Sequence, residues 1–560
     1  MHARERPAAL RDRRADRLDD VGFGHARTVA SAWLARYAVG VTTIPACLRT
    51  AAAEAPDTEA VADGAVRLTF AQLDAEVTRF AKACVARGLQ PGDRAAVWAP
   101  NSASWVVAAL GILAAGGVLV PVNTRFKGEE VRYALGKVRA RLLVVHDGFL
   151  GTDYLAMLRG TDLDTVVTID DTSDPTALAF TAFLAIGDAV PDAEIDRRID
   201  ALKPQDVSDI LFTSGTTGYP KGAMVSHAGN LRVNAAWSDM VGLRLGDRYL
   251  LVNPFFHSFG YRAGLLACLI RRATIVPLAV FDAEAALRLV QQERITVFPG
   301  APTVYTTLLD HQRRSGYDLS SVRLAVTGAT VVPVPLLERM RTELGFTDVI
   351  TAYGLTESCG TATVCPPDTD PHRLSTSCGR AIPGTEVAIV DPEGRPLSPG
   401  EHGEIVIRGY NVMVGYFEDP DATAAAIDAD GWLHTGDIGW MDADGFLRVT
   451  DRIKDMYVVG GFNVYPAEVE RMLARHAAVA EAAVVGEPDP RMGEVGHAFV
   501  RLRPGTAATA EELTGFCREE MANFKVPRRI TFVDELPRTA SGKVQKFRLR
   551  PSGGSPCPRP

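Results

Sequence analysis

Residues 211–222 read LFTSGTTGYPKG. This stretch combines glycine, serine, threonine and proline with one lysine and no acidic residue. Glycine lets backbone N–H groups approach an anion closely, hydroxyl groups donate hydrogen bonds, and lysine adds a positive charge. The P-loop pattern G-x-x-x-x-G-K-S/T does not fit, because Pro220 lies five positions after Gly215 and Lys221 is followed by Gly222. The stretch is therefore a phosphate loop of another kind or a plain turn. The other motifs of the chain are needed to distinguish these two possibilities.

The composition is that of a globular protein with more than one domain. The chain has 560 residues, of which 47% are hydrophobic and 23% charged, and its net charge is -8. A general nucleic-acid binder would show a basic stripe or domain, so we exclude that class, although a basic pocket for a small phosphorylated molecule remains compatible. None of the eight cysteines forms a C-x-x-C pair. This favours a reducing compartment, and we expect a cytoplasmic protein.

One uncharged run is about as long as a minimal transmembrane helix. Residues 105–122 read WVVAALGILAAGGVLVPV, but Gly116–Gly117 interrupts the run and Pro121 ends it. We therefore expect a buried helix, a glycine turn and a short buried strand, and no transmembrane segment. Residues 1–40 carry no signal-peptide core and are expected to form a disordered extension, and residues 551–560 a tail.

The middle of the chain alternates short apolar runs with amphipathic segments, which is typical of α/β layers. The expected buried strands are RAAVWAP (94–100), RLLVVHD (141–147), TVVTID (165–170), RYLLVNP (248–254), ATIVPL (273–278), ITVFPG (295–300), RLAVTG (323–328) and DVITAYG (348–354). Residues 402–409 and 446–451 indicate antiparallel strands. The predicted fold class is α/β. A large N-terminal domain of several subdomains with mostly parallel sheets spans residues 41–450, and a small mobile α+β domain spans residues 451–550.

Five further stretches accompany the opening loop. In chain order they are NPFFHSFG (253–260), TAYGLTE (351–357), WLHTGD (432–437), DRIKDMYVVGGFNVYPAEVE (451–470) and PRTASGK (537–543). Together, over residues 41–550, they resemble the adenylate-forming superfamily, which contains acyl-CoA synthetases, luciferase-like enzymes and peptide-synthetase adenylation enzymes. The resemblance implies an ATP-dependent acid–CoA ligase that converts a carboxylate to an acyl-adenylate and then to an acyl-CoA.

The resemblance also explains the residue types. Attack of a carboxylate on the α-phosphate of ATP brings two anions together, so catalysis depends on charge compensation and positioning. The residues implied to bind ATP are Thr213, Ser214, Gly215, Thr216, Thr217, Gly218, Lys221, Gly328, Ala329, Thr330, Tyr353, Thr356, Asp437 and Arg452. Among them Asp437 and Arg452 hold the ribose, and Tyr353 stacks on the adenine. Thr216 and Glu357 are the implied ligands of Mg²⁺.

The same resemblance assigns the catalytic and conformational residues. Lys543 is the catalytic lysine that bridges the carboxylate and the α-phosphate. Lys454 is the hinge about which the small domain rotates for the second half-reaction. Gly460, Gly461 and Phe462 then face CoA; luciferase-like relatives carry Lys-Gly where this chain has Gly460–Gly461, which counts against luciferase-like oxidation. Glu357 and His257 are further candidate catalytic residues. His257 either orients the acyl carboxylate beside Phe256 and Phe259 or is a hydrogen-bonded core histidine.

The acyl substrate is predicted from a closer resemblance. Phe256, Phe259, Tyr261 and Gly300 are expected to line the acyl pocket, with Phe255 beside them. The stretches ILFTSGTTG, NPFFHSFGYRAGLLACL, AYGLTES and KDMYVVGGFNVYPAEVE resemble most the CoA ligases of actinobacterial steroid degradation. These activate the propanoate side chain of a methylated bicyclic indanedione. The alternatives are a medium- or long-chain fatty acid–CoA ligase and an adenylation enzyme that loads a carrier protein. The latter is disfavoured because no carrier domain follows in this chain.

The implied partners are a small carboxylic acid, ATP and CoA, with Mg²⁺ as cofactor. The Pro-then-Gly-Lys arrangement around Lys543 resembles the site at which acetyltransferases silence acyl-CoA synthetases, so an acetyltransferase and a deacetylase acting on Lys543 are expected partners. The sequence leaves the oligomeric state open, a dimer included.

Overall fold

The computed structural model describes residues 42–213, 220–312, 314–328, 332, 334–367, 369–452, 455–459, 462–489, 492–521, 523–538 and 544–549. At residues 451, 452, 458, 462, 463 and 547 only the backbone is described. All of these residues belong to the compact unit that begins at Thr42. The domain boundaries expected at residues 41, 451 and 551 stay predictions.

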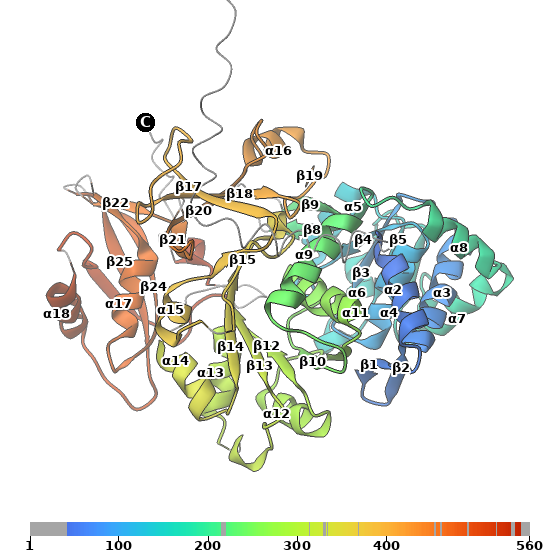
Figure 1. The fold of residues 1–560 in the computed structure, drawn as a ribbon, viewed down its shortest axis with the longest axis horizontal. Coiled ribbons are helices and arrows are strands. Elements are labelled where there is room, and N and C mark those ends of the chain that lie inside the picture. The colour runs from blue at the N-terminus through green and yellow to red at the C-terminus, as the bar shows by residue number, and fades with distance from the viewer. Residues whose placement is uncertain are drawn as a thin grey trace, which may run out of the picture. The chain divides into compact units, whose positions relative to one another are not determined.

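The first large sheet carries most of the predicted strands. Its order within the described residues is β16-β15-β14-β13-β12-β10-β11-β1-β2 (Figure 1). Their bounds are β1 Glu59–Asp63, β2 Val66–Thr69, β10 Arg248–Leu251, β11 Thr274–Pro277, β12 Val297–Pro299, β13 Leu324–Gly328, β14 Asp348–Tyr353, β15 Thr363–Val364 and β16 Arg380–Ala381. The strands β1, β11, β10, β12, β13 and β14 pair in parallel, in this order. The predicted mostly parallel sheet is thereby confirmed.

The second large sheet has the order β19-β9-β8-β4-β3-β5-β6-β7. Its strands are β3 Arg94–Trp98, β4 Val118–Pro121, β5 Leu142–Val145, β6 Thr165–Thr168, β7 Leu178–Ala179, β8 Val207–Thr213, β9 Lys221–Ser226 and β19 Gly415–Tyr416. β8 and β9 pair antiparallel on either side of residues 214–219, so they form the two arms of a hairpin around the opening loop. The uncharged run at 105–122 forms the buried helix α4 (Ala103–Ala114) and the buried strand β4, as predicted.

Helices lie between the two large sheets and on their outer faces (Figure 1). α4 contacts β3 and β4 of the second sheet and β1 of the first, and α9 (His227–Met240) contacts both β9 and the π-helix η3 (Tyr261–Leu266) that follows β10. The other helices of this region are α2 Ile44–Glu54, α3 Phe70–Ala86, α5 Gly128–Val138, α6 Tyr154–Met157, α7 Phe180–Ile186, α8 Asp192–Ala201, α10 Ser258–Gly260, α11 Ala267–Arg271, α12 Ala283–Gln292, α13 Pro302–Asp310, α14 Val334–Thr342, α15 Pro371–Thr376 and α16 Pro420–Ala426. The core is thus built from two sheets with a shared helical layer.

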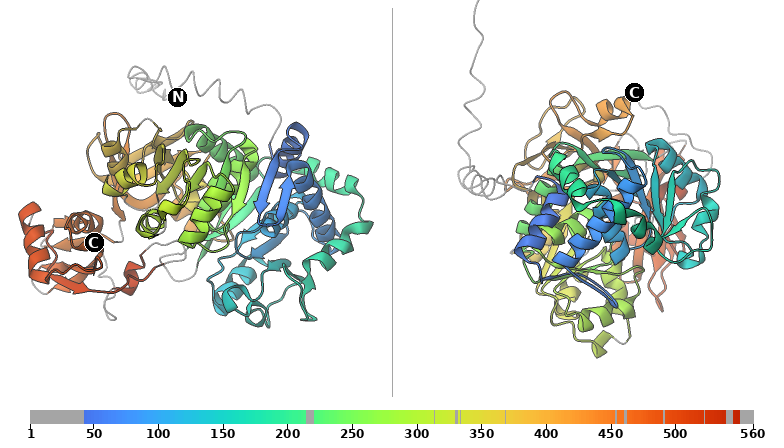
Figure 2. Two further views of the ribbon diagram at one scale, coloured as in Figure 1. Left: turned by 90° about the horizontal axis from the view of Figure 1, so that it is seen from below. Right: turned by 90° about the vertical axis from the view of Figure 1, so that its right-hand side faces the viewer.

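Two smaller sheets complete the fold. The order β17-β18-β20-β21 is antiparallel and uses β17 Thr385–Val390, β18 Gly403–Gly409, β20 Leu433–Met441 and β21 Leu447–Arg452. The last sheet is C-terminal and comprises β22 Tyr457–Val459, β23 Phe462–Val464, β24 Val479–Asp489, β25 Gly493–Leu502 and β26 Arg529–Phe532. The helices α17 (Pro466–Ala474) and α18 (Ala510–Glu520) pack together on it around one apolar core (Figure 2). The predicted α+β arrangement of this region is confirmed.

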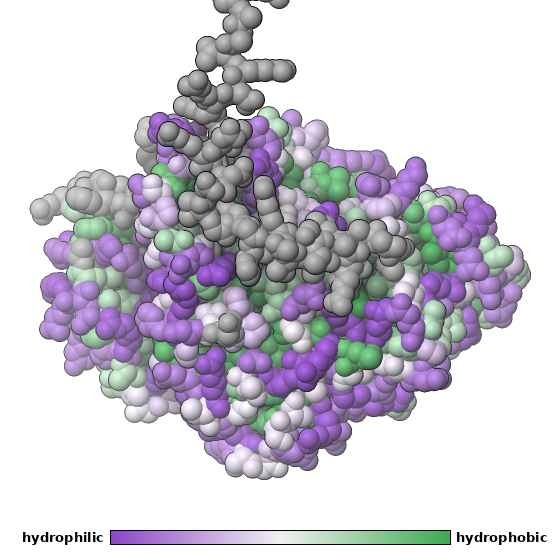
Figure 3. Space-filling view, viewed as in Figure 1, coloured by the Kyte–Doolittle hydropathy of each residue, from purple (hydrophilic) through white to green (hydrophobic). Residues whose placement is uncertain are grey.

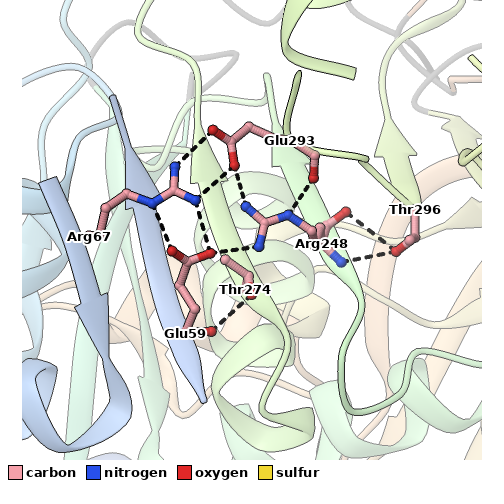
Figure 4. A network of polar contacts seen from close by, with 6 residues as sticks. All are labelled: Glu59, Arg67, Arg248, Thr274, Glu293 and Thr296. Atoms are coloured by element: carbon pink, nitrogen blue, oxygen red, sulfur yellow. Dashed lines mark hydrogen bonds and ion pairs between the residues drawn. The ribbon is translucent and has the colours of Figure 1, made fainter. Parts of the chain in front are cut away.

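Charged side chains form a network at the amino-terminal ends of β1 and β10 in the first large sheet (Figure 4). Arg248, the first residue of β10, donates from Nη1 to Glu59 at 2.6 Å and also pairs with Glu293. Arg67 joins the same two carboxylates at 2.7 and 2.8 Å. Because a network of four charges shares its ordering cost, it stabilises this edge more than an isolated surface pair would. The candidate site residues lie at the opposite, carboxyl ends of the strands.

Apolar side chains on the surface are scattered. On the face shown in Figure 3, hydrophobic residues occur in small groups between hydrophilic ones. The large exposed apolar residues come from separate parts of the chain, such as Leu150, Leu245 and Val414. Within the described part of the chain, every helix is too short or too polar to traverse a bilayer.

Candidate active site

The site residues are collected at the carboxyl ends of parallel strands. The segment of His257 follows β10, Gly300 follows β12, Gly328 ends β13 and Tyr353 ends β14. Since neighbouring parallel strands end at the same edge of a sheet, these segments lie side by side. Open α/β sheets bind their ligands outside this edge. The fold therefore brings together four segments that the sequence had placed far apart.

The β8–β9 hairpin positions the lysine of the opening stretch. Thr213 and Lys221 are register partners across the hairpin. The ammonium group of Lys221 lies 5.0 Å from the centroid of the Tyr416 ring, and the Tyr416 hydroxyl donates to Oε1 of Glu357 at 2.9 Å. Burial and the adjacent Glu357 carboxylate raise the pKa of Tyr416 well above its ordinary value, so its hydroxyl keeps its proton and acts as donor. Tyr416 thus links the predicted phosphate cation to the predicted metal ligand, a role that the sequence analysis missed.

Glu357 fits the requirements of a magnesium ligand. It lies in the short helix η5 (Thr356–Ser358), is half-buried, and its backbone oxygen accepts from the Met413 N–H at 2.8 Å. The bond from Tyr416 orients the carboxylate. Mg²⁺ is commonly bound by one or two carboxylate oxygens together with substrate phosphates and water. The chemistry of this hard donor, which Tyr416 links to Lys221, therefore matches Mg²⁺ bound with a nucleotide.

The predicted adenine and ribose residues are joined by a hydrogen bond. The Tyr353 hydroxyl donates to Oδ2 of Asp437 at 2.7 Å, and Asp437 is only 4% exposed. The backbone of Asp437 on β20 is paired with that of Arg452 at the end of β21. Three residues assigned to the nucleoside thus meet where β14 approaches the antiparallel sheet.

His257 is half-buried and neutral. Its Nδ1 accepts from the Phe259 N–H at 3.2 Å, where His257 caps the short helix α10. Burial, reinforced by the positive charge of Arg262, lowers the pKa of His257 to about 4. Because Nδ1 is an acceptor, the proton of the neutral ring lies on Nε2, which then serves as a donor. This tautomer suits a residue that orients an acyl carboxylate.

The aromatic residues assigned to the acyl pocket divide into two groups. Phe256 and Phe259 are half-buried, and the Phe259 ring lies edge-on to Trp237 at a centroid distance of 6.4 Å. Tyr261 is fully buried and packs against Trp105 at 6.0 Å. Phe255 is also fully buried and packs against the same tryptophan, at 4.9 Å. Both residues are therefore buried in the core around Trp105 in this structure. Phe256 and Phe259 are therefore the partly exposed aromatic residues of this segment. The assignment of Phe256, Phe259, Tyr261 and Gly300 to the acyl pocket stays a prediction.

The acyl segment, residues 253–262, is held by an asparagine that lies outside the predicted motifs. Asn101 donates from Nδ2 to the carbonyl oxygens of Leu251 and Asn253, each at 2.9 Å, and its Oδ1 accepts from the Phe255 N–H at 2.7 Å. Asn101 follows β3 of the second sheet, so it ties the edges of both large sheets together. The bend after β10 is also tight, since a Cβ on Gly260 would lie 2.2 Å from the Pro254 carbonyl oxygen.

Several predicted residues lie outside the described residues, so their roles stay predictions. They are Ser214, Gly215, Thr216, Thr217, Gly218, Ala329, Thr330, Lys454, Gly460, Gly461 and Lys543, together with the side chains of Arg452 and Phe462.

Comparison with known proteins shows the family to which the chain belongs. The model of the AMP-binding enzyme family matches residues 48–417, and that of the AMP-binding enzyme C-terminal domain matches residues 468–543. The chain belongs to the AMP-binding enzyme family. The family predicted from the sequence motifs is thereby confirmed, and with it an acyl-CoA ligase that uses ATP and CoA and forms an acyl-adenylate.

Relatives of this AMP-binding enzyme extend over almost its whole length. A ligase of Rhodococcus jostii (strain RHA1) named (7a-methyl-1,5-dioxo-octahydro-1H-inden-4-yl)propanoyl:CoA ligase is 52% identical over 91% of this chain and 98% of its own. A ligase of Mycobacterium tuberculosis with the same name is 49% identical over 91% of this chain and 99% of its own. The crystal structure of the anthranilate CoA ligase AuaEII with anthranoyl-AMP superposes with a TM-score of 0.81 at 30% identity, covering 90% of this chain and 96% of AuaEII.

Proposed function

We propose that this enzyme activates the propanoate side chain of a methylated bicyclic indanedione, a product of steroid catabolism, as its CoA thioester. The observation that carries the proposal is the 52% identity over 98% of a relative named for this substrate. Relatives named as medium-chain acyl-CoA ligases are 36% identical. A bicyclic dione also differs from a fatty acid by two ketone oxygens, which need hydrogen-bond donors once they are removed from water.

Buried donors near the acyl segment support this choice. The Tyr261 hydroxyl and the Trp237 Nε1–H are both fully buried and, among the described side chains, neither has a hydrogen-bond partner. Trp237 touches Phe259, and Tyr261 lies two residues beyond it. Buried polar groups without partners are costly, so their retention favours a ligand that supplies an acceptor. A ketone oxygen supplies such an acceptor, and an alkyl chain does not.

The chemistry proceeds in two steps. In the first, a carboxylate oxygen forms a bond to the α-phosphorus of ATP while the bond to the bridging oxygen breaks, and pyrophosphate leaves. Lys221 neutralises the departing phosphates, His257 orients the carboxylate through Nε2, and Lys543 bridges the carboxylate and the α-phosphate. Glu357 would hold Mg²⁺, which would supply further charge neutralisation of the phosphates. In the second step the CoA sulfur attacks the acyl carbon and AMP leaves, after rotation at Lys454 has brought Gly460 and Gly461 to the thiol.

A panel of acids tests the proposal. Pyrophosphate release is measured with the bicyclic propanoate, octanoate, palmitate and an amino acid, and the acyl product is then identified with CoA or with a phosphopantetheinylated carrier protein as acceptor. Thioester formation on CoA with the bicyclic acid is expected. Efficient transfer to the carrier protein alone would point to a carrier-loading enzyme instead.

Regulation by acetylation belongs to the same proposal. Acetylation of Lys543 would remove the positive charge that adenylation requires. Incubation with a protein acetyltransferase and acetyl-CoA, followed by mass spectrometry of the modified peptide, is expected to locate the acetyl group on Lys543. Full activity with Lys543 unmodified after that treatment would contradict it.

A further inference from the structure

The structure contains an ion pair between two fully buried side chains. Arg262 of the π-helix η3 and Asp209 of β8 are both 0% exposed, and Nη2 of Arg262 lies 2.6 Å from Oδ1 of Asp209. Removing two charges from water is expensive, so a buried pair contributes little net stability compared with apolar residues of the same volume. Stability alone therefore does not account for this ion pair, and a functional role is expected.

Asp209 anchors the pair to the hairpin that carries the opening loop. Its Oδ2 accepts from the Ser208 hydroxyl at 2.9 Å and from the side-chain amide of Asn230 on α9. Ser208 and Asp209 lie near the start of β8, the strand that ends at Thr213. The carboxylate is therefore fixed to the base of this β8–β9 hairpin, called the phosphate hairpin, and to α9.

The second arm of the guanidinium reaches the turn of the metal ligand. Nη1 of Arg262 donates to the backbone oxygen of Thr356 at 2.9 Å. Thr356 is the first residue of η5 and immediately precedes Glu357. Arg262 itself lies five residues after His257 in the acyl segment. One planar cation thus joins three separate parts of the site: the phosphate hairpin, the acyl segment and the Glu357 turn.

A π-helix at this point is consistent with a functional constraint. Regular α-helical geometry is replaced from Tyr261 to Leu266, and such irregularities are frequent at functional sites. A lysine at position 262 would place a single point charge where arginine offers two donor arms in a fixed plane. Arginine is therefore the residue type that satisfies both Asp209 and the Thr356 carbonyl.

We propose that Arg262 is a positioning residue for the adenylation step, which holds the Glu357 turn in place against the phosphate hairpin and the acyl segment. The proposal rests on the adenylation chemistry of the family and not on the identity of the acid. Whichever acid the panel favours therefore serves for the test, and failure of the steroid assignment leaves this test intact.

Arg262→Lys keeps the charge opposite Asp209 and removes the arm to Thr356. We expect the KM for ATP in pyrophosphate release and the dissociation constant for ATP by calorimetry to rise at least fivefold. Thioester formation from a supplied acyl-adenylate should stay within twofold of the parent, because that step no longer uses the pyrophosphate contacts.

Arg198→Lys is the matched control. Arg198 is also buried, pairs with Glu194 at 2.8 Å, and donates to the carbonyl oxygens of Leu89 and Ala115 at 2.8 Å, but it lies in α8 outside the site. Its variant should lose thermal stability to a similar degree while the KM for ATP stays within twofold. An equal rise in the KM for ATP in both lysine variants would show that the effect follows from lost stability.

Asp209→Asn and a neutral double variant complete the set. Asp209→Asn removes the negative charge of the pair but keeps a side-chain oxygen that can accept from Arg262, and it leaves the arm to Thr356. It should therefore lower the unfolding temperature with less than a twofold change in the KM for ATP. The double variant Asp209→Asn with Arg262→Gln buries no charge and lacks the arm to Thr356. Its KM for ATP should also rise at least fivefold, and it replaces Arg262→Lys in the test if that variant does not fold. A parental KM for ATP in either variant that lacks the arm, or an equal loss in both half-reactions, overturns the proposal.

Discussion

The Tyr353 hydroxyl donates a hydrogen bond of 2.7 Å to Oδ2 of Asp437, and this contact joins the end of β14 to β20. From the sequence, the Tyr353 ring is expected at the adenine and Asp437 at the ribose, as separate contacts. The structure shows that one orients the other. Since hydrogen bonds to charged acceptors contribute about 1.5–3 kcal/mol, the tyrosine hydroxyl should affect ribose binding without touching the ribose.

Tyr353→Phe is expected to raise the KM for ATP roughly tenfold, which corresponds to about 1.4 kcal/mol, with little change in kcat. The ring remains available for stacking, while Asp437 loses the donor that orients it. Steady-state kinetics with varied ATP measures the effect. Tyr154→Phe is the control, because the Tyr154 hydroxyl makes a comparable 2.9 Å bond to Thr124 away from the site. Similar KM values for parent and Tyr353→Phe would show that the Tyr353 hydroxyl does not orient Asp437 for ribose binding.

Lys543→Ala is expected to abolish adenylate formation while largely sparing CoA transfer from a supplied acyl-adenylate. The reason is that the lysine compensates charge only while the carboxylate and the α-phosphate approach each other. Pyrophosphate release and thioester formation are measured separately. Equal loss of both half-reactions would indicate a structural role for Lys543.

Lys454→Pro is expected to show the reverse pattern. Proline fixes φ and would stiffen the hinge, so adenylation should survive while thioester formation slows. The same two assays apply, with Lys543→Ala as the opposite reference. A variant that makes thioester at the parental rate would show that the small domain does not pivot at residue 454.

Stability should depend on pH through His227. Its imidazole is 1% exposed and its Nδ1 accepts from the Ile44 N–H at 3.2 Å. Burial lowers the pKa of His227 from 6.5 to about 4. The unfolded chain therefore binds a proton more readily between these values, so this contribution is complete above pH 6.5 and is lost as pH falls toward 4, by up to about 1.4 kcal/mol per pH unit.

His227→Asn removes the titrating group and keeps an acceptor for Ile44. The thermal-unfolding midpoints of parent and variant, measured from pH 7.5 down to pH 5, should converge or cross as the pH falls. A constant difference between the two midpoints across this range would mean that His227 is not the group that couples stability to pH.

The strands and the order of the site motifs were predictable, because each is a local property. RLAVTG became β13 and DVITAYG became β14 as short apolar runs that end in small or turn-forming residues. The contacts that assemble the site were not predictable in this way. Arg262 and Asp209 are 53 positions apart, and neither residue type indicates a fully buried partner. Tyr261 is predicted to line the acyl pocket because it follows aromatic residues, but its packing against Trp105 could not be read from that pattern.

The central claim concerns the acyl substrate, and one comparison tests it most directly. The value of kcat/KM is measured for the bicyclic indanedione propanoate, octanoate and palmitate at identical ATP and CoA concentrations. We predict a value for the bicyclic acid at least roughly tenfold above either fatty acid, a gap of about 1.4 kcal/mol in transition-state binding. A higher value for octanoate or palmitate would contradict the steroid assignment and leave a fatty acid–CoA ligase in its place.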